Sequence, residues 1–293
     1  MHAYLQQLDD AVGLASSPRF LKLLSQPYRL GRSKMLELIA LGKPGGIPSL
    51  AKTFWNESMH IVLPERVSLA LFRYGFFEAE LTRALIQLVR PGMVFFDIGA
   101  HIGYFSLLAS ELVGTQGQVH SFEPTSTSFS ILRRNTETKS NVTLVNAAVY
   151  SKEGALQLQD FGVAYSAFNS IYAGKMRRAE RRKLHAQKYT AQAVTLAQYV
   201  ATTEVKPDVI KIDAEGAELS ILAGLESALA TVRPILTVEV GDTVDSSDVP
   251  RSRPVIAWLM AHDYQPTEFV AGEFVPHQPR DVYQYTNLTC FPR

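Results

Sequence analysis

The sequence contains a single cysteine and no long uninterrupted run of apolar residues. Because Cys290 stands alone, neither a disulfide within the chain nor a cysteine-based metal cluster can form, which is typical of a reducing compartment. No apolar run approaches the roughly 20 residues that cross a bilayer. The N-terminus, MHAYLQQLDDAVGL, also lacks the charged-then-apolar pattern of a signal peptide. We therefore expect a cytoplasmic protein without a membrane span.

An excess of charge of one sign is also missing. The 29 Lys and Arg residues nearly balance the 28 Asp and Glu residues, and the formal net charge is +1. This balance predicts no general attraction to nucleic acid or to an anionic membrane. Of the 293 residues, 46% are hydrophobic, which is enough to bury a full core. We expect one elaborated domain, or one domain with an appendage.

The pattern of apolar residues changes along the chain and predicts two parts. Residues 1–74 indicate an N-terminal extension of two or three short helices followed by a small hairpin that turns at Asn56-Glu57. Residues 75–293 alternate strand-like apolar runs with helical segments. Strands that are apolar throughout and linked by helices indicate a parallel sheet covered on both faces. The expected fold is α/β, with a seven-stranded, doubly wound, Rossmann-like sheet.

Seven runs supply the strands of this expected sheet. The last two runs are joined by a short loop, so one of them should run antiparallel at or near the sheet edge. The candidate strands are residues 93–99, 117–124, 142–149, 209–215, 235–240, 264–270 and 286–292.

A basic stretch, GKMRRAERRKLHAQK, interrupts the strand and helix pattern within an insertion around residues 160–190. A solvated helix is the usual form of such a charge run. The alternative is a lid or patch for a phosphorylated or acidic substrate. A nucleic-acid binder would show several basic surfaces with interleaved aromatics, whereas this chain has one basic run. We expect no stable nucleic-acid partner.

The stretch FFDIGAHIGYFSLL, residues 95–108, has the pattern of a strand, a glycine-bearing turn and a helix. Asp97 lies at the expected carboxyl end of the strand, where doubly wound sheets bind their ligands. Gly99 and Gly103 frame the turn, and glycine lets the backbone approach a ligand closely. Glu123 ends the next strand, 20 residues beyond Gly103. A carboxylate that holds a ribose is expected at about that spacing.

Two nucleotide-like cofactors could occupy such a turn. A dinucleotide site needs G-x-G-x-x-G so that a glycine and the helix dipole meet a pyrophosphate. The middle glycine is missing between Gly99 and Gly103, and Asp97 would repel a pyrophosphate. S-adenosylmethionine (SAM) carries an ammonium and a sulfonium instead, and Asp97 suits that charge. The sequence therefore favours SAM over a nicotinamide cofactor.

Five blocks of the sequence resemble an FkbM-type methyltransferase, a SAM-dependent class I family. They are FFDIGAHIGYFSLLAS, VHSFEPTSTSFSILRRN, VTLVNAAVYSKEGALQL, PDVIKIDAEGAELSILAG and RPILTVEV, and together they span roughly residues 75–292. The resemblance implies that Glu123, next to Pro124, holds the ribose. For the turn it implies a SAM loop of Asp97, Gly99, Ala100 and Gly103, with His101 and Tyr104 beside it. For the adenine it implies contact with the NAAV run of Asn146, Ala147, Ala148 and Val149.

The block KIDAEGAE supplies the candidate catalytic residues. Lys211 and Asp213 alternate along a strand and so face the same side, and Glu215 begins the next turn. Glu239 ends the following strand, so the resemblance places three carboxylates beside the substrate. Methyl transfer to an alcohol depends mostly on positioning, and a base that removes the hydroxyl proton helps. We expect Asp213 or Glu215 to be that base or to position the hydroxyl, with Glu239 assisting.

Two other interpretations of these acids stay open. Asp213 and Glu239 could hold a divalent cation such as Mg²⁺ that binds a sugar diol or lowers the pKa of the hydroxyl. Alternatively, the acids only pair with Lys211 or cap the next helix.

The resemblance implies an O-methyltransferase that acts on a sugar hydroxyl of a glycan, glycolipid or glycosylated natural product. Asn169 and Ser170 could border the acceptor pocket, and the extension could form a homodimer or line that pocket. The alternatives are a methyltransferase for a non-sugar small molecule, for a nucleotide-linked substrate or for RNA. A non-catalytic interaction protein that retains the fold is a further alternative.

Overall fold

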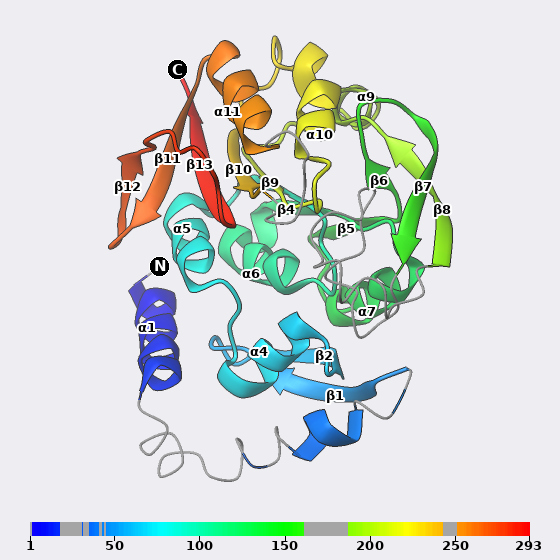
Figure 1. Cartoon of the computed structure of the whole chain (residues 1–293), viewed down its shortest axis with the longest axis vertical. Coiled ribbons are helices and arrows are strands. Elements are labelled where there is room, and N and C mark those ends of the chain that lie inside the picture. Colours follow the sequence, from blue (N-terminus) through cyan, green and yellow to red (C-terminus); the bar gives the residue numbers. More distant parts are fainter. Residues whose placement is uncertain are drawn as a thin grey trace.

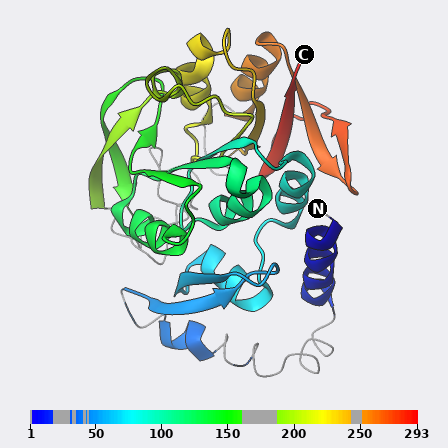
Figure 2. The same ribbon diagram turned by 180° about the vertical axis from the view of Figure 1, so that it is seen from behind.

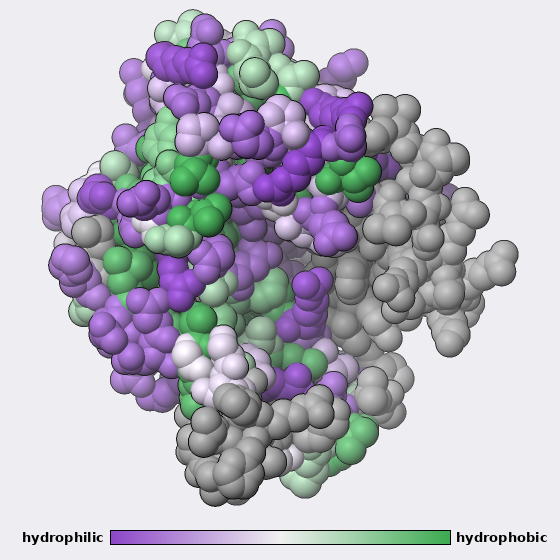
Figure 3. Space-filling view, turned by 60° about the vertical axis from the view of Figure 1, so that its left-hand side comes forward, coloured by the Kyte–Doolittle hydropathy of each residue, from purple (hydrophilic) through white to green (hydrophobic). Residues whose placement is uncertain are grey.

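The computed structural model describes residues 2–17, 31, 35–40, 43, 45–160, 187–242 and 251–293. Most of the basic stretch, together with Asn169 and Ser170, lies outside the described residues. No helix in these ranges is both long and apolar enough to cross a membrane. On the face drawn in Figure 3, the hydrophobic residues of the described part form small patches that hydrophilic residues separate.

A central eight-stranded sheet organises the described part of the chain (Figure 1). Five of its strands are parallel, whereas β13 runs antiparallel to both of its neighbours. In order across the sheet, the strands are β12 (Glu273–Pro276), β11 (Tyr264–Val270), β13 (Thr286–Pro292), β10 (Ile235–Val240), β9 (Val209–Ile212), β3 (Val94–Ile98), β4 (Gln118–Phe122) and β5 (Val142–Val145).

The burial of the central strands follows from their sequence. Every residue of β9 is buried, as is all of β3 after its first residue, because helices cover both faces of the sheet. From β3 the strand order runs outward in both directions, with β4 on one side and β9 on the other. The winding therefore reverses between β3 and β9, which is where such sheets bind ligands.

Helices lie on both sides of this sheet in Figures 1 and 2. Short 3-10 turns, η1 (Gly114–Gln116) and η3 (Glu226–Ala228), follow two of them. One side carries α5 (Ala79–Leu88), α6 (Tyr104–Val113) and α7 (Ser126–Thr136), and the other carries α9 (Leu196–Thr203), α10 (Glu218–Leu225) and α11 (Ser252–Ala261).

All seven predicted runs contain strands, but one of them is not a single strand. Residues 142–149 divide into β5 and β6 (Ala148–Val149), so the prediction of one strand is wrong. The chain bends between them, because the Ala147 amide donates to the Val145 carbonyl and the Asn146 side chain donates to the carbonyl of Glu123. β6 joins a separate three-stranded sheet with β7 (Gly154–Asp160) and β8 (Gln187–Val194).

The C-terminal hairpin also differs in detail from its prediction. The antiparallel strand was expected at or near the sheet edge, and β13 lies inside the sheet between β10 and β11. The connection between β11 and β13 contains the edge strand β12, which pairs with β11. This arrangement brings residues at the start of β13 close to the end of β10, where Glu239 pairs with Asn287.

The N-terminal residues form the predicted hairpin, together with helices that pack beside it. β1 (Ile47–Lys52) and β2 (Ser58–Leu63) pair antiparallel, and α1 (His2–Ser16), residues 35–40 and α4 (Arg66–Tyr74) are helical. Glu65 begins α4 by accepting hydrogen bonds from the Val67 and Ser68 amides, both at 2.7 Å. Gly75, in the left-handed region at a φ of 80°, ends this helix.

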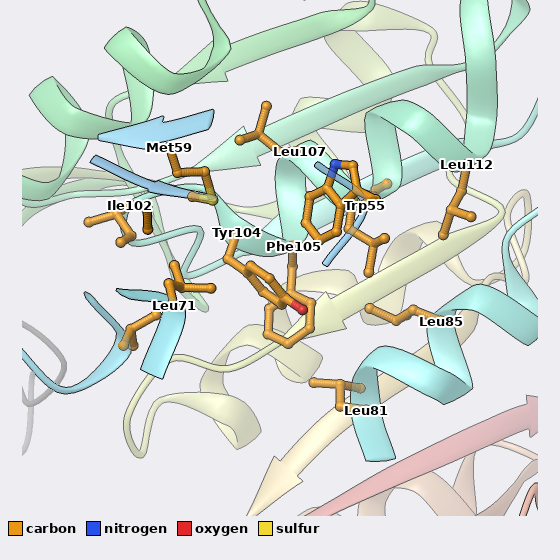
Figure 4. Close-up of a cluster of buried hydrophobic side chains, with 14 of the residues drawn as sticks. Trp55, Met59, Leu71, Leu81, Leu85, Ile102, Tyr104, Phe105, Leu107 and Leu112 are labelled. Carbon is orange, nitrogen blue, oxygen red and sulfur yellow. The ribbon is translucent and has the colours of Figure 1, made fainter. Parts of the chain in front are cut away.

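The hairpin shares a hydrophobic core with the sheet-covering helices. Figure 4 shows Trp55 and Met59 of the hairpin gathered with Tyr104 and Phe105 of α6 and with Leu85 of α5. The Trp55 and Tyr104 rings lie 5.5 Å apart between centroids. Burial of these side chains, at about 1.5–3 kcal/mol for each large residue, holds the extension against the sheet domain.

Asn135 of α7 makes a polar connection between the hairpin and the turn after β3. Its Nδ2 donates to the His60 carbonyl at 3.0 Å and to the Ile102 carbonyl at 2.8 Å, while its Oδ1 accepts from the His60 amide at 2.6 Å. Asn135 is buried, so water cannot replace these partners.

Replacing Asn135 with Ala should lower the free energy of unfolding by about 2–4 kcal/mol, because backbone groups would lose partners in a buried site. Urea unfolding would measure this change. The exposed neighbour Arg134→Ala is the matched control and should change stability by less than about 0.5 kcal/mol. Equal stabilities of the two variants would contradict the proposed role of this connection.

Candidate active site

A cavity opens at the carboxyl ends of β3, β4, β9 and β10, with about 1360 Å³ of empty space when its open mouth is included. The N-terminal part of the chain contributes Arg66, Val67, Phe77 and Glu78 to its wall. The predicted site residues that line the cavity are Gly99, Ala100, His101, Tyr104, Glu123, Pro124, Ala147, Ala148, Lys211, Asp213, Glu215 and Glu239. Three other predicted residues, Asp97, Gly103 and Asn146, are not part of its lining.

The turn after β3 is shaped by its two glycines. Gly99 has a φ of 76°, and a Cβ there would lie 1.9 Å from the Asp213 carbonyl oxygen, so the turn and the segment after β9 touch through their backbones. Gly103 has a φ of 92°, and a Cβ there would lie 2.6 Å from Leu132 Cδ1 of α7. The missing side chain at Gly103 therefore lets α6 pack on α7. The missing side chain at Gly99 lets the turn after β3 touch the backbone after β9, at the point where the winding of the sheet reverses.

Glu123 lines the cavity just beyond the end of β4 and is fixed by backbone donors. Its Oε2 accepts from the His101 amide at 3.0 Å, and its Oε1 accepts from the amide and hydroxyl of Thr125. Burial raises the pKa of Glu123, although the hydrogen bonds from Thr125 and His101 oppose the shift. Each carboxylate oxygen has two lone pairs, so Oε1 is fully used and Oε2 can still accept one ribose hydroxyl.

Tyr104 also lines the cavity, but its hydroxyl is directed into the protein. Its oxygen lies 3.2 Å from Thr82 Oγ1, and Thr82 in turn donates to the Phe77 carbonyl at 2.7 Å. Burial raises the pKa of the Tyr104 hydroxyl far above its ordinary value. Tyr104 therefore stays neutral.

Asp97 lies fully buried beneath the turn rather than in the cavity wall. Its Oδ2 accepts from Ser106 Oγ at 2.7 Å, and its Oδ1 lies 3.2 Å from Lys211 Nζ. The sequence analysis expected Asp97 to suit the charge of SAM. In this structure Lys211 is the charged partner of Asp97.

Lys211 is the buried cation at the centre of the site, with 2% of its side chain exposed. Burial alone would lower the pKa of Lys211, but Asp97 and Asp213 overcome that effect and raise it above its ordinary value. Asp213 Oδ2 lies 3.7 Å from Lys211 Nζ on the cavity side. Lys211 therefore links a carboxylate under the turn with a carboxylate in the cavity.

The three predicted carboxylates do converge. Oxygen atoms of Asp213, Glu215 and Glu239 all lie within 4.8 Å of one another. A different acid, Glu218, caps the turn before α10. Its Oε1 accepts from the Gly216 amide at 2.9 Å and from the Ala214 amide at 3.3 Å. Glu215 thus remains in the cavity wall.

A divalent cation at these acids gains no support from the geometry. The ammonium of Lys211 stands beside Asp213 and already supplies positive charge to the group. An acidic cluster alone is common in proteins, and an Mg²⁺ site normally needs near-octahedral oxygen geometry.

Glu78 is a cavity residue that the sequence analysis missed. It precedes α5, it is half-buried, and its backbone has a φ of 43°, which is uncommon for a residue other than glycine. Asn287 Nδ2 donates to Glu78 Oε2 at 3.2 Å. Burial, and next the charge of Asp213, raise the pKa of Glu78 to about 7, although Lys211 and Asn287 oppose the shift. No spacing in the sequence signals the contact with Asn287, because the two residues lie 209 positions apart.

The strand order and the position of the cavity define the class of the protein. An antiparallel strand inserted between the last two strands of a doubly wound sheet, with a cavity at the switch point, is the class I SAM-dependent methyltransferase fold. A sequence model of the methyltransferase FkbM domain matches residues 97–266, which is more than half of the chain. The chain belongs to the FkbM methyltransferase family.

Two curated relatives share part of this sequence. The hexuronic acid methyltransferase AglP of Haloferax volcanii is 26% identical over 177 residues, which cover 59% of this chain and 66% of that protein. The 31-O-demethyl-FK506 methyltransferase FkbM of Streptomyces tacrolimicus is 31% identical over 163 residues, which cover 48% and 62%. The matched region thus spans less than two thirds of the length of either relative.

Solved structures show only distant similarity. The methyltransferase FkbM from Methylobacillus flagellatus is 16% identical, with a TM-score of 0.42 over 76% of this chain and 54% of that chain. The fibrillarin of Aeropyrum pernix with bound SAM is 10% identical, with a TM-score of 0.43 over 84% and 99%. These scores are too low to carry an argument, so the fold assignment rests on the strand order.

The close approach at Gly99 can be tested against a glycine with the same backbone requirement. Gly92 has a φ of 86°, but a Cβ there would meet nothing within 4 Å. Gly92→Ala should cost about 1–2 kcal/mol for the left-handed backbone alone. Gly99→Ala should cost clearly more, because its Cβ collides with the Asp213 carbonyl. Urea unfolding of both variants compares the two costs, and similar values would contradict the contact.

Removing the buried cation should be strongly destabilising. Lys211→Met leaves Asp97 buried without its partner, so the free energy of unfolding should fall by about 3–5 kcal/mol. Lys206→Met, at an exposed position before β9, should leave stability nearly unchanged. Chemical denaturation at neutral pH without added ligand gives both values. A small loss for Lys211→Met would show that Asp97 is stabilised by other groups.

Proposed function

We propose that this protein transfers the methyl group of SAM to a hydroxyl oxygen of a sugar in a glycan, a glycolipid or a glycosylated natural product. The observation that carries the proposal is that Glu123 and the carboxylate group of Asp213, Glu215 and Glu239 line the same cavity. One part of that wall suits an adenosine and the other suits an acceptor with several hydroxyls.

The residues present fit SAM better than a phosphate-bearing cofactor. Glu123 offers a fixed carboxylate for the ribose, and Ala147 and Ala148 leave room for the flat adenine. The carboxylates in the wall favour a cationic ligand and would repel a pyrophosphate. When bound, SAM supplies a methyl group on a positively charged sulfur. The side chains of this chain then have to hold the acceptor hydroxyl in line with that methyl group.

The acceptor class is supported by the wall and by the relatives. Asp213, Glu215 and Glu239 can accept hydrogen bonds from neighbouring hydroxyls of a sugar and orient one of them. One curated relative is named as a methyltransferase of hexuronic acid, and the other is named for a 31-O-demethyl substrate. The first name agrees with a sugar acceptor, and the second agrees with transfer to oxygen.

Cofactor choice can be tested by calorimetry with SAM and NAD. The protein should bind SAM and show no heat with NAD. Glu123→Gln should weaken SAM binding by at least tenfold, because charge-assisted hydrogen bonds to the ribose are worth about 1.5–3 kcal/mol. Glu137→Gln, at an exposed position just after α7, is the control and should bind SAM like the wild type. Binding of NAD without SAM would overturn the proposal.

The acceptor can be searched with SAM that carries a labelled methyl group. Glycans, glycolipids and glycosylated natural products form one arm, and aglycones and RNA form the other. Mass increases of one methyl group in the sugar arm support the proposal. Transfer confined to the second arm would replace the sugar acceptor by another class.

A further inference from the structure

Glu78 stands in the cavity wall together with the acidic residues that follow β9 and end β10. It belongs to the segment between α4 and α5, so it reaches the cavity from the N-terminal part of the chain. Its left-handed backbone is fixed, because the Glu78 carbonyl accepts from the Thr82 amide at 2.8 Å. Thr82 Oγ1 also donates to the neighbouring Phe77 carbonyl at 2.7 Å. Backbone conformations of this kind persist where the surrounding structure over-determines them, and they cluster at functional sites.

The side chain of Glu78 is oriented by a residue 209 positions away in the sequence. Asn287 of β13 donates to its Oε2, and Asn287 pairs with Glu239 across β10 and β13. This contact holds Glu78 next to the carboxylate group of Asp213, Glu215 and Glu239. With Oε2 held by the amide, Oε1 is the oxygen that can accept a proton.

The charges around Glu78 come from every element that packs against it. Asp213 and Lys211 act from the β9 side, Arg66 acts from α4, and the neutral Tyr104 lies on α6. Burial and Asp213 favour the protonated carboxyl, while Lys211, Asn287 and Arg66 favour the charged carboxylate. The balance leaves a carboxylate that exchanges a proton near neutral pH, as a general base should.

We propose that Glu78 is the catalytic base that takes the proton of the acceptor hydroxyl. The inference rests on the proposed function and concerns a residue that precedes the region matched by the family model, residues 97–266. The hydroxyl oxygen forms a bond to the methyl carbon as the carbon–sulfur bond breaks, the sulfur keeps that electron pair, and the hydroxyl proton passes to Glu78 Oε1. Asp213 is committed to Lys211 at 3.7 Å, so it positions the acceptor rather than taking the proton.

The number of protons released when the cofactor binds tests whether Glu78 lies near the sulfonium. This measurement needs no acceptor. Calorimetry at pH 7 in buffers of different ionisation enthalpy measures the protons released on binding of SAM and of S-adenosylhomocysteine. Only SAM carries the sulfonium charge, which should drive a half-protonated Glu78 to its charged form. We expect proton release with SAM, little with S-adenosylhomocysteine, and loss of the difference in Glu78→Gln.

A matched control is available two residues away. Glu80 is exposed and pairs with Arg83, so Glu80→Gln should release protons like the wild type. Equal release with both ligands that is lost in Glu78→Gln would place Glu78 at the ammonium end of the cofactor and overturn the proposal. Unchanged release in Glu78→Gln would overturn it as well.

The rate of transfer gives a second readout, measured on the acceptor found in the labelled-methyl search. In the wild type, kcat should rise with pH below 7 as Glu78 loses its proton, because bound SAM lowers the pKa of Glu78 from its value of about 7 in the free protein. Glu78→Gln should lower kcat by about 100-fold or more and remove this rise. It should weaken SAM binding only several-fold, through loss of the same charge interaction that releases protons. Retention of both the rate and the rise in this variant would contradict the assignment.

Asn287→Ala provides a variant for the case in which Glu78→Gln does not fold. Loss of the Asn287 hydrogen bond should raise the pKa of Glu78, so the rise of kcat should move to higher pH. An unmoved profile would overturn the proposal. Failure of the proposed function is distinguishable, because the wild type itself would then bind no SAM or transfer no methyl group.

Discussion

The arrangement of the site depends on one buried ammonium between two carboxylates. Asp97 and Lys211 are paired residues on the neighbouring strands β3 and β9, and Lys211 reaches on to Asp213 at the cavity wall. A charge this deep is costly unless it is paired, so the three side chains fix one another. The winding of the sheet reverses between the same two strands, so this interaction connects the turn after β3 with the carboxylates that follow β9.

The part of the cavity wall around Gly99 and Glu123, which we propose for the cofactor, could be predicted from the sequence because it is local. Gly99, Glu123 and the NAAV run follow strand ends at short spacings, and each strand is recognisable from its apolar residues. The spacing predicted that the carboxylate of Asp97 meets a positive charge. It could not show that the ammonium of Lys211 lies beside this carboxylate. That depends on the pairing of β3 with β9, more than a hundred residues later in the chain. Asp97 is therefore buried beneath the turn, where it lies beside Lys211.

The part of the wall that we propose for the acceptor was less predictable because it is assembled from distant segments. Arg66 and Glu78 come from the region before β3, and Tyr285 and Asn287 come from the C-terminal hairpin. No spacing in the sequence relates these residues, and their meeting depends on β13 entering the sheet between β10 and β11. The split of residues 142–149 into two strands has a similar origin, because a side-chain contact from Asn146 to the Glu123 carbonyl accompanies the bend.

One part of the cavity wall comes from residues close together in the sequence, and the other comes from distant segments. This difference has a physical consequence for which acceptor the cavity can select. The wall toward the acceptor combines four carboxylates, Glu78 among them, with the cations of Lys211 and Arg66. Carboxylates accept hydrogen bonds but cannot donate them, so they suit an acceptor that presents several O–H groups. An acceptor with its own carboxylate would be repelled near Asp213 and Glu239 and would need Arg66, which is exposed at the cavity wall. Changes in the segments that bring these few charges together can therefore alter the acceptor while the cofactor turn stays the same.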